Sequence, residues 1–290
     1  MGGEIAVDYS LGRCEVALWS RTPSSLERVA HRAHDLLGTL EGLGIADPDR
    51  VAQAQVKLSF TADLGQACQG AALVVECVPE DFDVKVEVLR RVGALAPAAV
   101  VASNTSSLGI SDLGIASALG GQFLGTHYWN PPTLMPLVEV VVGRETDKRV
   151  VAAVLALLRD IGKEPAIVPD IPGFVWNRLQ FALLREAARL VQEEGVPATV
   201  IDLIVRRGLG RRWAILGPFE TVELGGVNTF VTVARRLFAE LQAADVDPEV
   251  LRWIVDQPPA VARPELIRRR DEGLAAALRA EAMEESHWNQ

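Results

Sequence analysis

The sequence predicts an α/β fold in which a doubly wound, mostly parallel sheet is followed by an all-helical C-terminal domain. Over the first 170 residues, short continuous apolar runs alternate with amphipathic segments. Strands that are apolar throughout are typical of a parallel sheet covered by helices on both faces. After Ile171-Pro172-Gly173 the strand-like runs stop and helical patterns dominate. We therefore expect a sheet domain over 1–170 and a helical domain over 171–290.

The elements of the sheet domain follow from this alternation in chain order. The apolar runs predict strands over 14–19, 72–78, 99–104, 122–129, 137–142 and 165–170. The amphipathic segments predict one helix that begins at Gly2 and others over 24–42, 82–96 and 147–162.

The second domain is expected to consist of helices. Apolar residues recur at helical spacing from Leu179 to Val191, which predicts one buried stripe on the first of these helices. The predicted helices cover 174–194, 197–207, 218–240, 247–255 and 263–283.

The composition is that of an ordinary soluble globular protein with an acidic balance. Of the 290 residues, 49% are apolar, and the formal net charge is −9. This charge argues against nucleic acid or an anionic membrane as the main partner. No apolar run approaches the roughly 18 residues that span a bilayer, and the first residues lack a signal sequence. Because the three cysteines have no metal or redox spacing, we expect them to be reduced in a cytoplasmic protein.

The start of the chain lacks a complete phosphate-binding motif. A dinucleotide-binding sheet normally opens with a strand and a Gly-x-Gly-x-x-Gly turn, where the pyrophosphate meets a helix N-terminus. Here Gly2-Gly3-Glu4 is similar to the last glycine of that turn and the helix it starts. The sequence therefore predicts a Rossmann-like domain without its N-terminal strand, with Gly2 at the cofactor. A start codon assigned too far downstream is favoured over a true fragment, because loss of a central strand would expose unpaired backbone groups.

The end of the strand at 14–19 bears on the choice of cofactor. Ser20 and Arg21 stand near the position where a residue that contacts the ribose is expected. NAD-binding domains usually place an acidic residue there, whereas an arginine can accommodate the 2′-phosphate of NADP. The predicted cofactor is NAD, with NADP left open. A solvent-facing turn is the alternative interpretation of these two residues.

His127 and Glu139 form a candidate catalytic pair. The histidine lies at the end of one predicted strand, and the glutamate follows on the next strand. Hydride transfer from a secondary alcohol requires a base for the hydroxyl proton, and histidine titrates near neutral pH. A carboxylate on the other ring nitrogen fixes the tautomer and stabilises the imidazolium. On spacing alone, a structural histidine remains the commoner alternative.

The motifs around this pair are more specific when taken together. In order and spacing they resemble the 3-hydroxyacyl-CoA dehydrogenase family, from Met1 to about residue 240. The motifs are Ser103 to Leu108, His127 with Asn130-Pro131, Glu139, Pro172-Gly173-Phe174 with Asn177-Arg178, and Glu76, Glu80 and Lys85.

The resemblance implies roles for five residues in catalysis. His127 would be the acid/base and Glu139 its partner. Ser106 and Asn130 would hold the substrate oxygen and the imidazole, since hydroxyl and amide groups can polarise a developing carbonyl. Asn177 would reach the site from the first helix of the second domain.

The resemblance also implies a cofactor site and an assembly. Glu80, Lys85 and Asn104 would lie along the cofactor, although a solvated helix charge is the alternative for Lys85. The family forms dimers through the helical domain, so we expect a homodimer that acts on a small-molecule substrate. No metal site is expected.

The details of the sequence favour one branch of the family. Asn130-Pro131-Pro132 and the segment 208–221 are more similar to gulonate dehydrogenase, lambda-crystallin and carnitine dehydrogenase than to CoA-thioester members. In that segment, Arg212 could bind a free carboxylate bidentately, or it could simply interact with a helix dipole.

The predicted function is reversible hydride transfer between nicotinamide and the 3-hydroxyl of a 3-hydroxyacyl-CoA or a free 3-hydroxy acid. One alternative is a gulonate- or carnitine-type dehydrogenase acting on a free carboxylic acid. The other is a non-catalytic structural or binding protein that has lost its cofactor loop.

Overall fold

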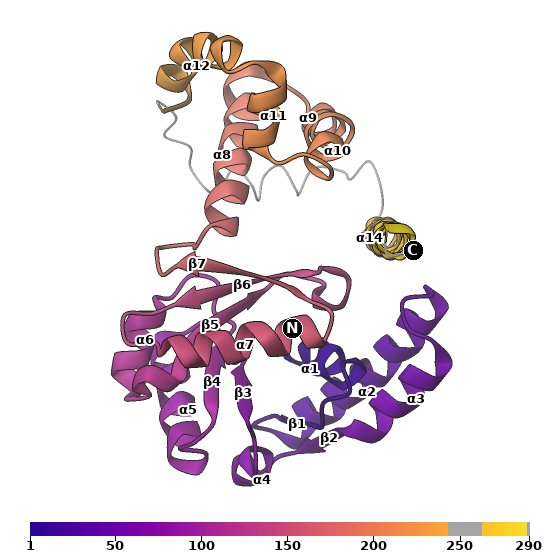
Figure 1. Ribbon diagram of the computed structural model, residues 1–290, viewed down its shortest axis with the longest axis vertical. Coiled ribbons are helices and arrows are strands. Elements are labelled where there is room, and N and C mark those ends of the chain that lie inside the picture. Colours follow the sequence, from indigo (N-terminus) through magenta and orange to yellow (C-terminus); the bar gives the residue numbers. More distant parts are fainter. Residues whose placement is uncertain (243–262, 289–290) are drawn as a thin grey trace. The chain divides into compact units, whose positions relative to one another are not determined.

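The computed structural model describes residues 1–242 and 263–288 (Figure 1). The chain divides into two compact units, one formed by Met1–Asn177 with Ile267–Gln290 and the other by Arg178–Leu266. The predicted helix at 247–255 lies outside the described residues.

The first unit contains seven strands among its described residues and helices that connect them. The strands are β1 (Val16–Trp19), β2 (Leu58–Thr61), β3 (Leu73–Glu76), β4 (Val100–Ser103), β5 (Phe123–Tyr128), β6 (Leu137–Val142) and β7 (Glu164–Pro169). The helices are α1 (Gly2–Leu11), α2 (Pro23–Gly42), α3 (Pro48–Lys57), α4 (Leu64–Cys68), α5 (Phe82–Leu95), α6 (Ile110–Ser117), α7 (Lys148–Asp160) and α14 (Arg263–Trp288).

The strands form two sheets in place of one continuous sheet. β1 pairs with β2 in parallel, and a second sheet has the order β3-β4-β5-β6-β7. All pairs in the second sheet are parallel except β5 with β6. The predicted fold class, a Rossmann-like and mostly parallel sheet followed by a helical region, is confirmed.

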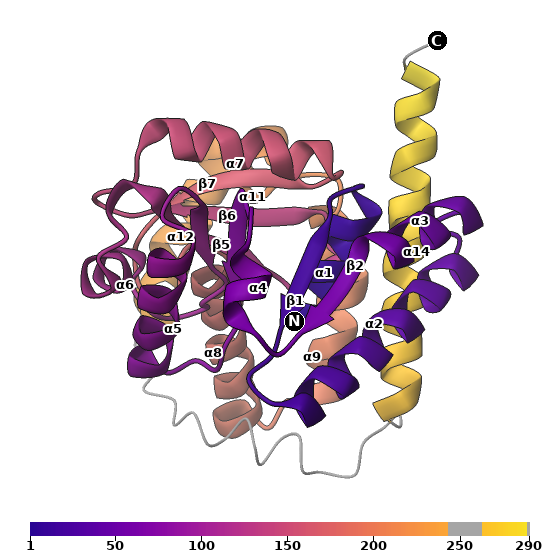
Figure 2. The same cartoon turned by 90° about the horizontal axis from the view of Figure 1, so that it is seen from below.

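The two sheets are separated between β1 and β3 (Figures 1 and 2). No strand among the described residues pairs with the edge of β1 that is not bound to β2, or with the outer edge of β3. Ala17 on β1 is exposed and Val74 on β3 is half-buried, whereas Val101 on β4 and every residue of β5 are buried. An interior strand of an α/β sheet is normally buried on both faces, so the break leaves both strands with the burial of edge strands.

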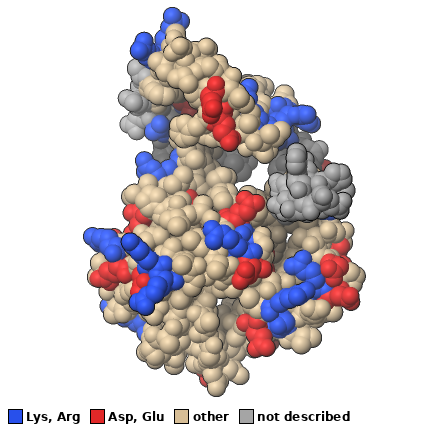
Figure 3. Space-filling model, in the orientation of Figure 1, with Lys and Arg blue, Asp and Glu red and all other residues tan. Residues whose placement is uncertain are grey.

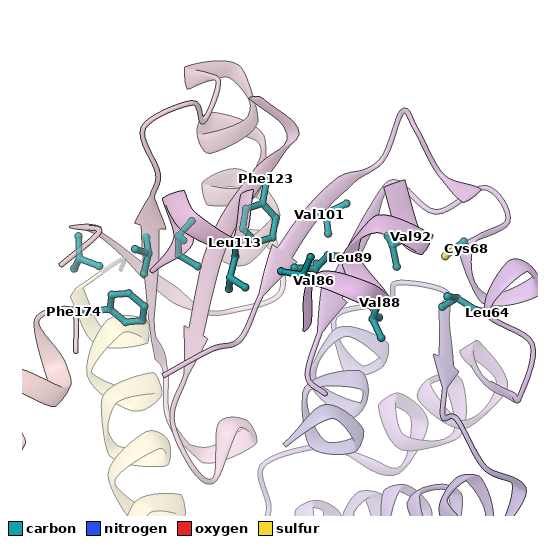
Figure 4. Close-up of a cluster of buried hydrophobic side chains, with 13 residues drawn as sticks. Leu64, Cys68, Val86, Val88, Leu89, Val92, Val101, Leu113, Phe123 and Phe174 are labelled. Atoms are coloured by element: carbon teal, nitrogen blue, oxygen red, sulfur yellow. The ribbon is translucent and has the colours of Figure 1, made fainter. Parts of the chain in front are cut away.

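Alternation along the strands divides the core of the larger sheet into two layers. One layer packs against α5 and α6 and includes Val101, Phe123 and Val141 (Figure 4). The other layer packs against α1 and α7 and includes Ala102, Leu124 and Val140. A third cluster joins α1, α2 and α3 to β2 and to Ala275 of α14.

The helical unit follows the predicted pattern with three differences. The apolar stripe predicted to be buried on its first helix is half-buried or exposed, with Leu179 63% exposed. Its described helices are α8 (Trp176–Glu194), α9 (Ala198–Ile204), α10 (Gly210–Trp213), α11 (Pro218–Gly225) and α12 (Val227–Gln242). The helix predicted over 197–207 continues through a π-helical turn, Val205–Leu209, into α10. The helix predicted over 218–240 is divided at Gly226, whose φ of +87° lies in a region that favours glycine.

Charged side chains of both signs are interspersed on the face shown in Figure 3. Among the described residues, no helix is both long enough and apolar enough to cross a membrane.

Candidate active site

The candidate site is built around His127 and Glu139, which lie opposite each other on adjacent strands. The antiparallel register of β5 and β6 pairs these two residues directly, and directly opposed side chains project from the same face of a sheet. The Nδ1 atom of His127 lies 2.8 Å from Oε2 of Glu139. His127 is 4% exposed and Glu139 is 2% exposed. Burial of both groups is consistent with a specific, hydrogen-bonded pair.

The second carboxylate oxygen of Glu139 is bound to the chain that follows β7. The backbone N–H groups of Val175 and Trp176 donate to its Oε1 atom at 3.1 and 2.8 Å. The turn before them uses positive φ values at Gly173 and Phe174. The ring of Phe174 meets the His127 imidazole edge-on, at a centroid distance of 5.5 Å. Glu139 is therefore fixed at both oxygens and can orient the imidazole.

Glu80 organises the loop that carries Ser106. Its Oε1 atom accepts hydrogen bonds from the backbone N–H of Ser106 at 3.0 Å and from the N–H and hydroxyl of Ser107 at 3.0 and 2.9 Å. It also accepts one from the hydroxyl of Thr105 at 2.6 Å. Burial acts to raise the pKa of Glu80, but these hydrogen bonds and the charge of Lys85 outweigh it and lower that pKa to about 2. The carboxylate is ionised at neutral pH.

Lys85 lies in a buried network beside this loop. Its side chain is 1% exposed, and its Nζ atom donates to both oxygens of Glu76 at 2.9 and 3.2 Å and to the carbonyl of Val78 at 3.0 Å. Glu80 lies 3.3 Å from the same Nζ, and the hydroxyl of Ser103 donates to Glu76 at 2.6 Å. These contacts engage Lys85 with protein atoms at the ends of β3 and β4.

Asparagine side chains connect the remaining parts of the site. Nδ2 of Asn177 donates to the carbonyl of Ser106 at 2.9 Å. Oδ1 of Asn104 accepts from the backbone N–H of Tyr128 at 2.8 Å, which joins the end of β4 to the end of β5. Asn130 is exposed and precedes a cis peptide bond to Pro131. These hydrogen bonds connect the loop after β4 to the end of β5 and to the start of the helix that follows β7.

Two tryptophans beside this edge were missed by the sequence analysis as site residues. Trp129, two residues after His127, stacks on Trp176 with ring centroids 3.7 Å apart and an interplanar angle of 19°. This contact could not be predicted from the sequence, because the two tryptophans belong to distant motifs. The turn after β7 brings them together. The stack joins the residue after β5 to the first residue of the helix that begins at Trp176.

The residues predicted for the cofactor fit part of a dinucleotide site. α1 begins at Gly2 with no side-chain cap, so its first N–H groups could receive a pyrophosphate. A Cβ atom at Gly2 would lie 3.2 Å from Cβ of Cys77, and one at Gly3 would lie 2.8 Å from Cγ1 of Val29; the packing of α1 therefore leaves little room for a side chain at either position. Ser20 and the exposed Arg21 follow β1.

Two further predictions concern residues outside this cluster. Arg212 is exposed on α10 in the helical unit, and its role stays a prediction. In the part of the chain that the structure describes, no group of three histidine, cysteine or acidic side chains could hold a metal ion.

Comparison with known protein families identifies the family to which the chain belongs. Residues 1–171 match the model of the 3-hydroxyacyl-CoA dehydrogenase NAD binding domain, and residues 173–260 match the model of the C-terminal domain of the same enzymes. The chain belongs to the 3-hydroxyacyl-CoA dehydrogenase family. The predicted family and class, an NAD-dependent dehydrogenase acting on CH–OH groups, are thereby confirmed, as is NAD as the cofactor of the domain. NADP remains a prediction from Ser20 and Arg21.

Relatives in this family include enzymes of the predicted branch. A 5-formyl-3-hydroxy-2-methylpyridine 4-carboxylate 5-dehydrogenase of Mesorhizobium japonicum is 35% identical over 87% of this chain and 81% of its own length. An L-carnitine dehydrogenase of Streptomyces coelicolor is 31% identical over 97% of this chain and 91% of its own. A crystal structure of a 5-formyl-3-hydroxy-2-methylpyridine 4-carboxylic acid 5-dehydrogenase, described as an NAD+-dependent dismutase, has a TM-score of 0.85 at 33% identity and covers 97% of this chain and 94% of that one.

Proposed function

We propose that this dehydrogenase interconverts a 3-hydroxy acid or 3-hydroxyacyl thioester and its 3-keto form, with His127 as the general acid/base. The observation that supports this proposal is the buried His127–Glu139 pair, in which the carboxylate holds Nδ1 of the ring. With Nδ1 engaged, Nε2 is the nitrogen that can accept the substrate hydroxyl proton. Bound NAD would supply the hydride acceptor.

The neighbouring polar groups would stabilise the reacting oxygen. Ser106 and Asn130 would donate hydrogen bonds to it as carbonyl character develops. Asn177 would keep the Ser106 loop in place through its hydrogen bond to the Ser106 carbonyl. Glu139 would orient the ring through its contact with Nδ1.

A substitution at the histidine tests the proposed base. His127→Ala should lower kcat by at least about a hundredfold, the usual scale for a general base, while NADH affinity stays near that of the native chain. His31→Ala, on the exposed face of α2, is the matched control. A His127→Ala variant with normal turnover would remove the mechanism.

Two relatives support the free acid as the substrate over the thioester. One is named as a dehydrogenase of a pyridine carboxylate and another as an L-carnitine dehydrogenase. Arg212 would bind the carboxylate through its guanidinium fork. Under this proposal the chain acts as a homodimer in the cytoplasm, where its free cysteines would stay reduced.

A non-catalytic role is the second candidate, favoured by one observation, the separation of the β1-β2 sheet from the sheet that contains β3. Titration with NADH and NADPH, followed by nicotinamide fluorescence, separates the two candidates. Saturable binding of either nucleotide supports the enzyme and identifies the cofactor. A well-folded chain that binds neither nucleotide supports the non-catalytic role.

A further inference from the structure

Lys163 is a buried cation that the candidate site does not use. It precedes β7 and is 7% exposed. Its Nζ atom donates to the carbonyl oxygens of Pro132 at 2.7 Å and Met135 at 3.1 Å. The same atom forms an ion pair with Oδ2 of Asp8 at 2.7 Å. The ammonium thus donates hydrogen bonds to two carbonyls and lies beside one carboxylate, so it connects three segments of the chain at one point.

The two carbonyls belong to the segment that connects the catalytic strands. This segment, 129–136, leaves β5 two residues after His127 and returns to β6 three residues before Glu139. Three of its residues are prolines, which have no backbone N–H: Pro131, Pro132 and Pro136. The segment therefore has more acceptors than donors, and Lys163, the residue before β7, supplies donors.

Asp8 connects the same ammonium to α1. Asp8 is 8% exposed and lies near the end of that helix, whose first residues carry the predicted pyrophosphate position. The segment also contacts this region through Leu134, which is buried in the cluster that contains Ala6, Val7 and Leu11. The Asp8–Lys163 ion pair and the buried side chain of Leu134 thus connect α1 to the segment that carries Asn130.

We infer that Lys163 is a positioning residue for the reaction, which holds segment 129–136 against α1 and thereby sets the placement of His127, Asn130 and Glu139. The inference rests on the proposed function of His127. Loss of this placement would lower turnover more than substrate binding, because small misplacements of reacting groups reduce rate steeply.

The variants must separate positioning from folding. Lys163→Met alone leaves Asp8 buried without its partner, which strongly destabilises a protein. The double variant Asp8→Asn with Lys163→Met removes both charges, and replacement of a buried ion pair by neutral residues is often tolerated. Lys163→Arg keeps a cationic donor for the two carbonyls. Lys148→Met, at an exposed lysine on α7, is the matched control.

The first readout is independent of catalysis. In the double variant the amide protons of Leu134 and Met135 should exchange at least about tenfold faster, since the hydrogen bonds that they donate within the segment open more often. The His127 ring resonances should also shift, whether or not that ring proves to be the base. Loss of turnover in His127→Ala tests the proposed function separately.

The second readout is the division between kcat and KM. The double variant should lose at least about tenfold in kcat with KM for the substrate within about threefold, and Lys163→Arg should recover most of that loss. Unchanged exchange and unchanged kcat in a folded double variant would overturn the inference. If the double variant does not fold while the Lys148→Met control folds, the ion pair is needed for folding. This outcome would also overturn the inference.

Discussion

At the scale of single residues, the chemistry depends on groups whose orientation is fixed from two sides. One carboxylate oxygen of Glu139 contacts Nδ1 of His127, and the other oxygen accepts hydrogen bonds from two backbone N–H groups. The sequence predicted the pair because both residues lie in recognisable strands, and the register then made them neighbours. The backbone donors could not be predicted, since they depend on the positive φ values of the turn at Gly173 and Phe174. The contacts of Lys163 also depend on tertiary structure.

Arg212 provides a prediction about the substrate. If its guanidinium binds a carboxylate, Arg212→Ala should raise KM for a free 3-hydroxy acid by about tenfold to a hundredfold, the worth of a charged hydrogen bond. Arg211→Ala, at the exposed neighbouring residue, should leave KM unchanged. Steady-state kinetics on a panel of acids and thioesters tests this. The carboxylate role is refuted if KM for every active substrate is the same in Arg212→Ala as in the native chain.

Asp8 gives a prediction about the pH dependence of stability. Burial raises the pKa of Asp8 to about 6 against the opposing charge of Lys163, and the phenol groups of Tyr9 and Tyr128 lie nearby. A raised folded-state pKa means that the folded protein binds the proton more tightly than the unfolded chain does. The stabilisation is complete below the unfolded pKa, near 3.8, and is lost as the pH rises through about 6.

The corresponding experiment compares the native chain with Asp8→Asn by chemical denaturation. Between about pH 4.5 and about pH 7.5, the native chain should lose about 2 kcal/mol of unfolding free energy relative to the variant. Asp49→Asn, at an exposed residue of α3, serves as the control and should show no such difference. A constant difference between native chain and Asp8→Asn at all pH values would contradict the assignment.

At the scale of elements, the long helices and buried strands were predictable and the short connecting elements were not. β2 has four residues and α4 has five, too few for a clear period. α3 was missed although Asp47 caps it and Pro48 occupies its first turn, a recognised start signal. α6 begins at Ile110, whose N–H is bound by Asp170, so its start is fixed by a residue far away in the sequence.

The turn between α7 and β7 allows a test of backbone conformation alone. Gly162 has a φ of +85°, and a Cβ atom there would meet nothing within 4 Å. Gly162→Ala should therefore destabilise by about 1–2 kcal/mol through the left-handed backbone. Gly38→Ala, inside α2 with equally open space, should stabilise by about 0.5–1 kcal/mol. Equal effects at the two positions, measured by denaturation, would show that the φ angle does not govern the cost.

At the scale of the whole molecule, the described part of the helical unit carries several large apolar side chains that are exposed. Its exposed side chains include Phe219 at 87%, Ile215 at 82% and Leu224 at 74%. Large exposed apolar patches mark interaction surfaces, and most soluble assemblies are symmetric copies of one chain. A second copy of this chain is thus the partner that we propose for these helices.

This surface can be tested by charge substitution. Phe219→Asp should raise the dimer dissociation constant by at least about tenfold, because a charge buried in an apolar interface loses its hydration without a partner. Val56 on α3 is also 87% exposed but lies in the first unit, so Val56→Asp should leave dissociation unchanged. Sedimentation velocity over a range of concentrations measures both. A dimer that responds equally to the two substitutions would place the interface outside α11, and a native chain that stays monomeric at all concentrations would exclude the dimer.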